Sequence, residues 1–410
     1  MSEVRTDDLD SRCDVDWASL IRPGDLVVAA QGVGEPTALL ESLLAASPAG
    51  VELFVGLSHS AVLAHTCPLP LVSFGRLGPL SRAVHHGNVE VIPAHFDDLP
   101  RVLQYRGRDL VVLVQVTGPD ASGCHSLGMA VDHTFELLSR ARAVIAEVNH
   151  QLPVTSAPRV PTSMFDTVVH TSRPLPVVHT PKMTDCHRQI AAYVAGLVPD
   201  GATLQLGLGS MASAVGIALC GHRELAVRSP LVGDWLLELA SARCLRTGAE
   251  AVVISEAAGS QQLYDYVSAS DVQISPVSKV SGPAARGEID RFVAVNFALE
   301  VDLTGQVNAE DIAAGYIGGI GGQAEYLRAA QRSEGGRSIL ALPATAGRYS
   351  RIVSRLDTST VTTPRSGVDF IVTEHGVADL RGRSLRERAE SLIAIADPEH
   401  RAALQKGPTR

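Results

Sequence analysis

The chain has 410 residues, more than one hydrophobic core usually organises, so we expect two α/β domains. Hydrophobic residues make up 45% of the sequence but aromatic residues only 4%, which favours parallel strands of Ala, Val, Leu and Ile buried between helices. A formal net charge of −9 provides no broad basic surface, so we expect neither nucleic acid nor a membrane as a partner.

The distribution of cysteine and histidine and the start of the sequence bear on compartment and metal content. Six cysteines are scattered without a CxxC pair, which predicts reduced thiols, and no Cys or His spacing matches a zinc site. The first residues, MSEVRTDDLDSRCDVDW, are acidic and lack the apolar segment of a signal peptide. No apolar run reaches membrane-spanning length. We therefore expect a cytoplasmic protein without a metal.

Apolar runs alternate with a helical pattern in the first part of the chain. The runs DLVVAA (25–30), DLVVLVQV (109–116) and AVIAEV (143–148) are typical of buried strands, and PTALLESLLAA (36–46) is typical of a helix. This order predicts βαβ units in doubly wound, mainly parallel sheets.

The middle of the chain changes character. Residues 151–185 are rich in Pro, Ser and Thr and weakly periodic, which predicts a connector over the domain surface. We therefore expect an N-terminal domain with its connector at 1–185 and a C-terminal domain at 186–410.

Two segments of the chain resemble each other without gaps. LIRPGDLVVAAQGVGEPTAL (20–39) aligns with LVPDGATLQLGLGSMASAVG (197–216), and each has a glycine turn, a strand, a glycine-rich loop and a helix. The aligned glycine pairs are Gly24 with Gly201 and Gly32 with Gly209. The match favours a duplicated domain, although any two βα units share some of this pattern.

The loop in QLGLGSMASAV (205–215) is a candidate anion site. Gly207 and Gly209 stand between a strand and a helix, where backbone amides can converge on a phosphate or a thioester oxygen. A tight turn without a ligand explains the motif equally well. The loop lacks the Lys-Ser/Thr of a P-loop and the third glycine of a dinucleotide fingerprint, which argues against a nucleotide cofactor.

Glycines also gather in GGIGGQAEYLRAA (318–330), directly before a predicted helix. So much glycine is entropically costly, which favours a positive φ or close ligand approach beside Gln323 over a simple turn. The preceding stretch 292–310 carries Asn296, Glu300 and Asp302 among apolar residues. A structural hydrogen-bond network and a site role are equally compatible with that pattern.

Glu256 is the carboxylate with the most suggestive position. It sits at the end of a predicted strand, after the run VVIS and shortly before Gly259 and Ser260, and α/β folds place ligands at the carboxyl ends of strands. The alternative is an exposed loop carboxylate, because Glu side chains are mostly exposed.

An ordered series of motifs extends over nearly the whole chain. It comprises GDLVVAAQGVGEPTAL, TGPDASGCHSLG, AVIAEVNHQLP, GLGSMASAV, GSQQLYDY, NFALEVDLTGQVNAE, GGIGGQAEYLRAA, RSILALPATA, SRIV, VTTPR and TEHGVADLRGRSLRERAESLIAIADPEHR. Together these resemble the acetyl-CoA hydrolase/4-hydroxybutyrate CoA-transferase family.

The resemblance implies two similar CoA-transferase-type α/β domains with an active-site cleft between them, usually in a homodimer. It also implies acyl-CoA as substrate, with coenzyme A as the only cofactor-like group, and a small-molecule acceptor. In the family's ping-pong mechanism a glutamate attacks the thioester and a glutamyl-CoA thioester forms. The CoA-binding residues expected here are Gly207, Leu208, Gly209, Ser210, Met211, Gly259, Leu299, Gly322 and Gln323.

The family's nucleophile does not carry over. Its His-Ser-Glu-Met stretch aligns with 228–231, so that Pro230 occupies the position of the glutamate. Asp234 matches a family aspartate, which argues against a slip of register. The Asn-His-Pro stretch expected near residue 282 is Ser-Gly-Pro at 281–283. Two such departures indicate changed chemistry.

Three hypotheses follow from this pattern. The first is an acyl-CoA enzyme that transfers the acyl group directly, to water or to a non-carboxylate acceptor, with Glu256, Ser229 and Asp234 as candidate catalytic residues. Its physical basis is that oxyanion donors alone stabilise a transition state by roughly 3 kcal/mol each. The second is ordinary CoA transfer between carboxylates through an unrecognised nucleophile. The third is a non-catalytic homologue that binds acyl-CoA.

Overall fold

The computed structural model describes residues 15–63, 67–81, 89–285, 287–313, 315–356 and 360–406. The chain divides into two compact units. Unit 1 comprises Met1–Val178 and Ser255–Val277, and unit 2 comprises His179–Ile254 and Ser278–Arg410. The predicted domains at 1–185 and 186–410 do not include this return of 255–277 to unit 1.

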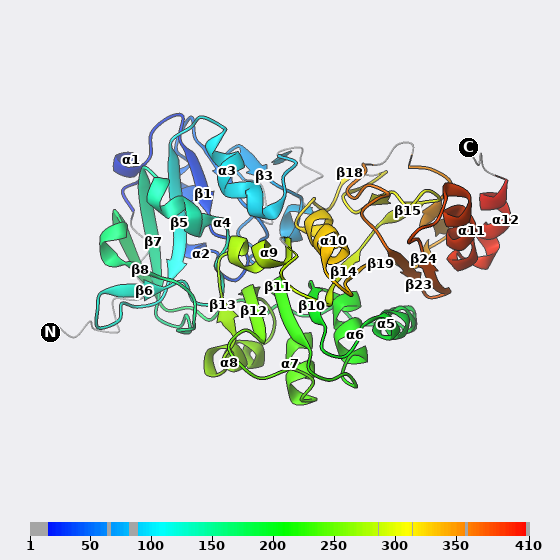
Figure 1. Ribbon diagram of the computed structural model, residues 1–410. Coiled ribbons are helices and arrows are strands. Elements are labelled where there is room, and N and C mark those ends of the chain that lie inside the picture. Colours follow the sequence, from blue (N-terminus) through cyan, green and yellow to red (C-terminus); the bar gives the residue numbers. More distant parts are fainter. Residues whose placement is uncertain are drawn as a thin grey trace. The chain divides into compact units, whose positions relative to one another are not determined.

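Unit 1 is built on one parallel sheet. Its strands are β1 (Leu26–Ala29), β2 (Glu52–Phe54), β3 (Leu71–Ser73), β4 (Val89–Val91), β5 (Leu110–Val116), β7 (Ala143–Asn149) and β9 (Thr167–Thr171). They pair in the order β4-β3-β2-β1-β5-β7-β9, every neighbour parallel. Figure 1 shows β1, β5 and β7 side by side. The predicted strands at 25–30, 109–116 and 143–148 correspond to β1, β5 and β7.

Short helices and three minor strands complete unit 1. The helices are α1 (Trp17–Leu20), α2 (Thr37–Ala46), α3 (Leu99–Gln104), α4 (His133–Leu137) and α8 (Gln261–Ala269), with 3-10 turns at Gly78–Ser81, Phe96–Asp98, Leu138–Arg140 and Thr162–Met164. The minor strands β6 (Cys124–Ser126) and β8 (Arg159–Pro161) pair antiparallel, and β13 (Gln273–Ile274) lies in the returning segment. The core is aliphatic, as the composition predicts, with Val27, Leu39, Leu53, Val111 and Ile145 fully buried.

Unit 2 repeats this architecture. Its main strands are β10 (Thr203–Leu206), β11 (Ala226–Val232), β12 (Val252–Ala257), β14 (Phe292–Phe297), β19 (Arg337–Ala341), β23 (Phe370–Thr373) and β24 (Gly376–Asp379). They follow the order β12-β11-β10-β14-β19-β23-β24, and β24 pairs antiparallel with β23. The division between the units falls within β12, after Ile254.

Helices and small β-ribbons surround the sheet of unit 2. The helices are α5 (Asp185–Leu197), α6 (Ser210–Ala218), α7 (Trp235–Ser241), α9 (Val277–Ala285), α10 (Gln323–Arg332), α11 (Leu385–Ile395) and α12 (Pro398–Gln405). The short strands are β15 (Glu300–Asp302), β16 (Val307–Asn308), β17 (Asp311–Ile312), β18 (Gly315–Tyr316), β20 (Thr345–Ala346), β21 (Tyr349–Ser350) and β22 (Ile352–Val353). Capping boxes at Thr184 and Ser384 start α5 and α11.

The gapless internal alignment has a counterpart in backbone geometry. β1 and α2 in unit 1 correspond to β10 and α6 in unit 2. All four aligned glycines have positive φ: +99° at Gly24, +72° at Gly201, +62° at Gly32 and +100° at Gly209. The two βα units therefore share their turns as well as their strands.

The prediction of a connector at 151–185 is wrong for part of that range. Residues 167–171 form β9, which pairs with β7 over five residues at one edge of the unit-1 sheet. The strand is short and mostly half-buried, because it lies at the sheet edge, and its sequence TVVHT shows little apolar alternation.

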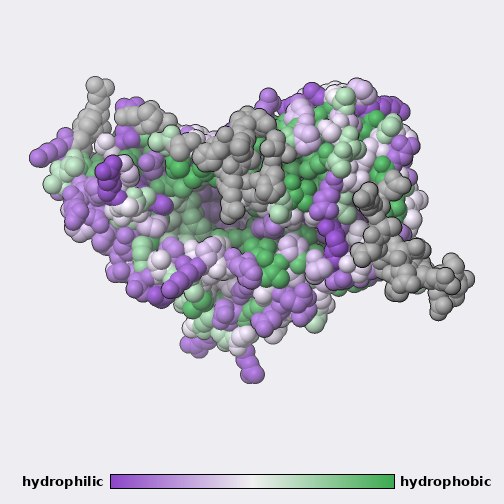
Figure 2. All heavy atoms as spheres, turned by 180° about the vertical axis from the view of Figure 1, so that it is seen from behind, coloured by the Kyte–Doolittle hydropathy of each residue, from purple (hydrophilic) through white to green (hydrophobic). Residues whose placement is uncertain are grey.

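The surface is of mixed character. On the face shown in Figure 2, hydrophilic residues predominate and smaller hydrophobic patches lie among them. Among the residues that the structure describes, no helix combines the length and the apolar character needed to cross a bilayer.

Candidate functional site

Both main sheets reverse their strand order at one point. In unit 1 the reversal lies between β1 and β5, and in unit 2 it lies between β10 and β14. Open α/β sheets bind ligands outside the carboxyl ends of the strands at such a switch point. The two aligned glycine loops follow β1 and β10, so each stands at the switch point of its own unit.

The loop of unit 2 borders open space. A Cβ atom added at Gly207 or Gly209 would meet no atom within 4 Å outside the neighbouring residues. Two side chains fix the backbone of the loop. Ser229 Oγ donates to the carbonyl of Leu206 at 3.0 Å, and Trp235 Nε1 donates to the carbonyl of Gly207 at 2.9 Å. A rigid glycine loop with a free face is what an anion or thioester oxygen requires.

The five residues of this loop differ in exposure. Gly207, Leu208, Gly209 and Ser210 are partly exposed, and Met211, in the first turn of α6, is buried. Their assignment as CoA contacts stays a prediction, supported by the open face of the loop.

The three residues around the family's glutamate position lie at the end of β11, the strand next to β10, and in the turn that follows it. Pro230 is partly exposed near the carboxyl end of β11. Ser229 is fully buried, and its hydroxyl faces the carbonyls of Leu206 and Leu231 at 3.0 and 3.1 Å. This geometry gives Ser229 a role in holding the loop. Asp234 is half-buried at the start of α7.

The other predicted CoA contacts of unit 2 lie after β14 and at the start of α10. Leu299 lies two residues after the end of β14 at the switch point, is partly exposed, and donates its N–H to the carbonyl of Asn308 at 2.8 Å. Gly322 precedes α10, and Gln323, its first residue, is buried and donates to Thr363 Oγ1 at 3.1 Å.

Backbone geometry accounts for three glycines of the 318–322 cluster. A Cβ at Gly318 would collide with the carbonyl of Ala309, and one at Gly322 would lie 2.8 Å from the ring of Tyr326. Gly321 has a φ of +54°. A ligand is not needed to explain these glycines, so the CoA contact at Gly322 stays a prediction.

The polar residues of 292–310 form local networks. Asn296 donates to Gln205 Oε1 at 2.8 Å, and Asp302 accepts from Thr304 and Gln306 in the turn that follows it. Asp302 is fully buried. These contacts favour the structural of the two interpretations for Asn296 and Asp302.

The segment 255–277 carries the remaining candidates, Gly259 and Glu256, into unit 1. The N–H of Gly259 donates to Tyr264 Oη at 3.3 Å, and its carbonyl accepts from Val178 N–H at 2.9 Å. Both backbone groups of Gly259 therefore already have partners. Its role as a CoA contact stays a prediction.

Glu256 lies directly against the glycine loop of unit 1. Its side chain is 3% exposed, and its Oε1 accepts from Val33 N–H at 3.0 Å. The carboxyl fills the space on the Cβ side of Gly32, where any side chain would collide with it. The loop after β1 thus holds an internal carboxyl on its glycine face, whereas the aligned Gly209 in unit 2 faces open space.

Burial raises the pKa of Glu256 to about 8, the dominant cause being loss of water around the carboxylate. The hydrogen bond from Val33 N–H lowers the pKa, the negative charge of Asp132 raises it, and the Gln31 side chain lowers it. At neutral pH the carboxyl is therefore predominantly protonated. A protonated carboxyl is an acid and a poor nucleophile.

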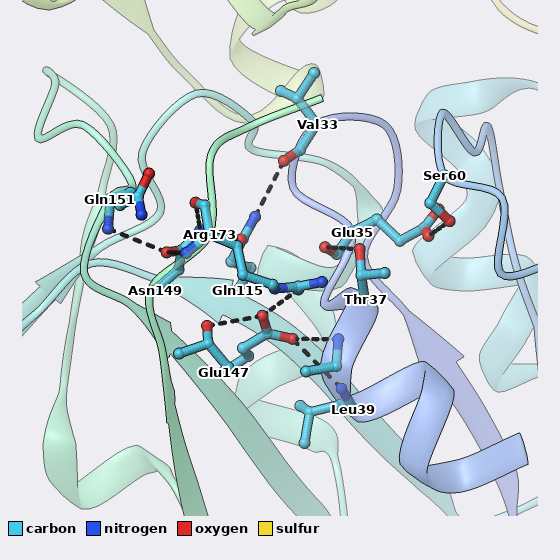
Figure 3. A network of polar contacts seen from close by, with 12 residues as sticks. Val33, Glu35, Thr37, Leu39, Ser60, Gln115, Glu147, Asn149, Gln151 and Arg173 are labelled. Atoms are coloured by element: carbon cyan, nitrogen blue, oxygen red, sulfur yellow. Dashed lines mark hydrogen bonds and ion pairs between the residues drawn. The ribbon is translucent and has the colours of Figure 1, made fainter. Parts of the chain in front are cut away.

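A small pocket adjoins the other side of the same loop. Its volume is about 120 Å³, and its lining residues are Gly32, Glu35, Thr37, Ser60, Gln115, Arg173, Pro174 and Pro176. All of them belong to unit 1 and lie at or beyond the carboxyl ends of its strands. Figure 3 shows the Arg173 guanidinium pointing toward Thr37 while Glu35 extends to Ser60.

A buried carboxylate holds Arg173, one of the lining residues (Figure 3). Glu147, on β7, has no exposed surface and is ion-paired with Arg173. It also accepts from Thr171 Oγ1 at 3.0 Å and from Ala38 N–H at 2.9 Å in the first turn of α2. Since Pro36 provides no side-chain cap, Glu147 satisfies the helix N-terminus.

Glu35 is the second carboxyl with altered acidity. Its pKa is raised by burial, and hydrogen bonds from Ser58 and Ser60 and the charge of Arg173 oppose this effect. The charge of Glu147 adds to the increase. Ser60 Oγ donates to the Glu35 carboxyl, which fixes its orientation toward the loop after β2.

Sequence reasoning missed most of this pocket. Glu35 stands three residues after Gly32 in the loop that aligns with Gly209–Ala212, and that alignment could have drawn attention to it. Arg173 lies in the stretch assigned to a connector, and no local signal connects it with Glu147.

The described part of the chain contains no group of three or more His, Cys, Asp or Glu side chains that could hold a metal ion. The expectation of no metal stays a prediction.

Comparisons with known proteins agree across the chain. Residues 14–184 match the model of the acetyl-CoA hydrolase/transferase N-terminal domain, and residues 259–407 match that of the acetyl-CoA hydrolase/transferase C-terminal domain. The chain is 37% identical over 333 residues to 4-hydroxybutyrate coenzyme A transferase of Clostridium kluyveri, covering 78% of each chain.

Two further proteins are similar over nearly the full length. Succinyl-CoA:cyclohexane-1-carboxylate CoA transferase of Geobacter metallireducens is 31% identical, over 97% of this chain and 94% of that protein. The crystal structure of RipA from Yersinia pestis superposes with a TM-score of 0.85 at 29% identity, over 95% of this chain and 94% of that one.

Proposed function

The chain belongs to the acetyl-CoA hydrolase/transferase family, and from this premise we propose that it transfers an acyl group from CoA without a glutamyl-CoA intermediate. The family comprises CoA transferases and acetyl-CoA hydrolases, so the chain is an acyl-CoA enzyme of this kind. The acyl group goes directly to water or to a small non-carboxylate acceptor.

The observation that carries this proposal is the retained loop beside Pro230. Ser229 and Trp235 hold the glycine loop of unit 2 with its face open, while the neighbouring Pro230 has no atom that can attack a thioester. The oxyanion function of such a loop does not depend on a covalent step. The open loop and the absence of a nucleophile at position 230 together support direct transfer of the acyl group.

Glu256 supplies the acid–base group in this proposal. The acceptor oxygen attacks the thioester carbonyl carbon, a C–O bond forms, and the C–S bond breaks. The acceptor loses a proton and the CoA sulfur gains one. A carboxyl with a pKa of about 8 is protonated at neutral pH and suits donation of that proton better than nucleophilic attack.

The test is the substitution Glu256→Gln, assayed by release of CoA from acetyl-CoA. We expect kcat/KM at pH 7 to fall by roughly 100-fold or more, the usual contribution of a positioned acid. Glu41→Gln, an exposed residue of α2 in the same unit, is the matched control and should retain activity. Unchanged kinetics in Glu256→Gln would remove this residue from the mechanism.

Ordinary CoA transfer between carboxylates is the second candidate, because both curated relatives above are named as CoA transferases. It requires a carboxylate nucleophile at a position other than 230. Trapping of the covalent intermediate distinguishes the two functions.

A further inference from the structure

We propose that Gln31 and Asp132 are positioning residues for the Glu256 acid: Gln31 fixes the direction of its carboxyl, and Asp132 keeps the proton on it. This inference rests on the proposed function, because both residues act on the reaction through Glu256. The protonation of Glu256 can be measured without turnover, so the two proposals are tested by separate measurements.

The backbone of unit 1 brings Asp132 and Glu256 together. Glu256 forms an antiparallel bridge with Ala130. A hydrogen bond from Val131 N–H to the carbonyl of Ser255, at 2.8 Å, continues this pairing. Asp132 is the next residue along the chain, and it is buried. Its carboxyl therefore starts from backbone that is fixed against the segment carrying Glu256.

Both carboxyls are held by the same short loop after β1. Asp132 accepts from Gln31 N–H. Glu256 accepts from Val33 N–H at 3.0 Å. Asp132 also accepts from Thr134 N–H and Thr134 Oγ1, at 2.8 and 2.6 Å. These donors hold the negative charge of Asp132 beside Glu256, where a like charge favours the protonated form of the second carboxyl.

The side chain of Gln31 has a fixed orientation. It is buried, and its Oε1 accepts from Leu57 N–H at 3.2 Å. Gly56 leaves room for this amide, since a Cβ atom there would lie 2.1 Å from the same oxygen. Because Leu57 occupies Oε1, the NH₂ group is the donor with which Gln31 interacts with the Glu256 carboxyl. Donation from a pinned amide gives that carboxyl one preferred direction.

The titratable groups around Glu256 favour the protonated carboxyl. Burial is the largest cause of its raised pKa, and the charge of Asp132 adds to the increase, while Val33 N–H and the Gln31 side chain oppose it. His133 follows Asp132 at the start of α4 and is fully buried, which lowers its pKa although the charge of Asp132 opposes this effect. His133 is therefore neutral at neutral pH and does not offset the charge of Asp132.

The experiment is infrared difference spectroscopy of the full chain from pH 5 to pH 10, with the spectrum of Glu256→Gln subtracted from that of the wild type. The C=O stretch of a protonated carboxyl then reports the proton on Glu256. We expect this band to disappear with a midpoint of about pH 8. In the Asp132→Asn background the midpoint should lie roughly one pH unit lower or more, because a like charge has been removed.

Asp302→Asn is the matched control. Asp302 is also buried, and its Oδ1 accepts from Thr304 N–H and Thr304 Oγ1, the same local bonds that Thr134 forms with Asp132, but it belongs to unit 2. This variant should keep the wild-type midpoint. Equal midpoints in the wild type and Asp132→Asn would overturn the role of Asp132. Equal shifts in the two Asn variants would overturn it as well, because the effect would then not be local.

Gln31→Met provides a second test that leaves Asp132 in place. It removes the amide but keeps the length of the side chain. The midpoint should lie above that of the wild type, because a donor to the ionised carboxyl is lost. In acetyl-CoA turnover kcat should fall about tenfold or more with KM nearly unchanged, since the acid is misdirected while binding is not affected. Gln104→Met, which removes an amide bonded to the Pro100 carbonyl in α3, should retain both wild-type values.

The two proposals can fail separately. Wild-type turnover in Glu256→Gln would refute Glu256 as the acid, and the infrared midpoints would still show whether Asp132 and Gln31 control its proton. Midpoints that stay at the wild-type value in both Asp132→Asn and Gln31→Met would refute the positioning roles alone.

Discussion

Glu256 shows how one buried carboxyl acquires a function from its surroundings. Its carboxyl accepts a hydrogen bond from Val33 N–H, fills the space beside Gly32, and has Asp132 as a nearby negative charge. Burial, the hydrogen bond and the charge each change the pKa of this carboxyl. Because desolvation dominates, the neutral form is favoured, and the residue is an acid at neutral pH.

The raised pKa of Glu256 makes stability depend on pH. The folded protein holds a proton up to about pH 8, whereas the unfolded chain releases it near pH 4.5. Between these values the folded state binds more protons, so the free energy of unfolding falls as pH rises. In Glu256→Gln this fall in the free energy of unfolding, which is of the order of a few kcal/mol in total, should be absent.

Urea titrations of both proteins from pH 5 to pH 9 measure this effect. The stability of Glu256→Gln relative to the wild type should increase through the window and level off above pH 8. A difference that stays constant over the whole range would show that Glu256 does not titrate with a raised pKa.

At the scale of elements, the loop between β1 and α2 requires glycine at position 32 for two separate reasons. Gly32 has a φ of +62°, and its missing side chain leaves room for the Glu256 carboxyl. Only the positive φ can be inferred from a local turn pattern. The second reason comes from Glu256, which is distant in sequence and also accepts from the neighbouring Val33 N–H, 223 positions away.

Gly32→Ala should lower the free energy of unfolding by roughly 2–4 kcal/mol, from backbone strain plus the collision with Glu256. Gly107→Ala is the control, since Gly107 has a similar φ of +66° and open space around it, and it should cost about 1 kcal/mol. In a Glu256→Ser background the excess cost of Gly32→Ala should shrink. Equal costs in both backgrounds would contradict the contact.

The N-terminus of α2 depends on Glu147, a residue that is also distant in sequence. Glu147→Gln leaves Arg173 without its buried partner and weakens the cap, so we expect a loss of about 3 kcal/mol in chemical denaturation. Glu52→Gln, which breaks the more exposed pairs with Arg106 and Arg108, should cost about 1 kcal/mol or less. Equal losses in the two variants would argue against the capping role.

Sequence patterns predicted the elements that have strong apolar runs. The strands β1, β5 and β7 and the helix α2 fall where the pattern places them, because central strands of a parallel sheet are buried on both faces. The edge strand β9 was missed, since its half-buried residues show no such run.

At the scale of the whole molecule, the two units share one plan. Each has a mainly parallel sheet with a switch point and a glycine loop after the strand at that point. The mixed α/β fold and the family are confirmed, because the motif series extends over nearly the whole chain. The expected dimer and cytoplasmic location stay predictions.

The candidate site was only partly predictable. Glu256 could be named from its place at a strand end, and Pro230 from the gapless count that starts at GLGSMASAV. The partners of Glu256 could not, because the return of residues 255–277 to unit 1 has no signal in composition or periodicity. The contact of Glu147 with Arg173 depends on the pairing of β7 with the edge strand β9, which sequence patterns missed.

The most direct test of the account is borohydride reduction of the enzyme during turnover of acetyl-CoA, followed by peptide mass analysis. Borohydride converts a glutamyl-CoA thioester into an alcohol, so that the side chain loses one oxygen and gains two hydrogens. We predict continued CoA release with every glutamate unmodified, Glu256 included. A reduced glutamate at any position would contradict direct acyl transfer and establish a covalent intermediate.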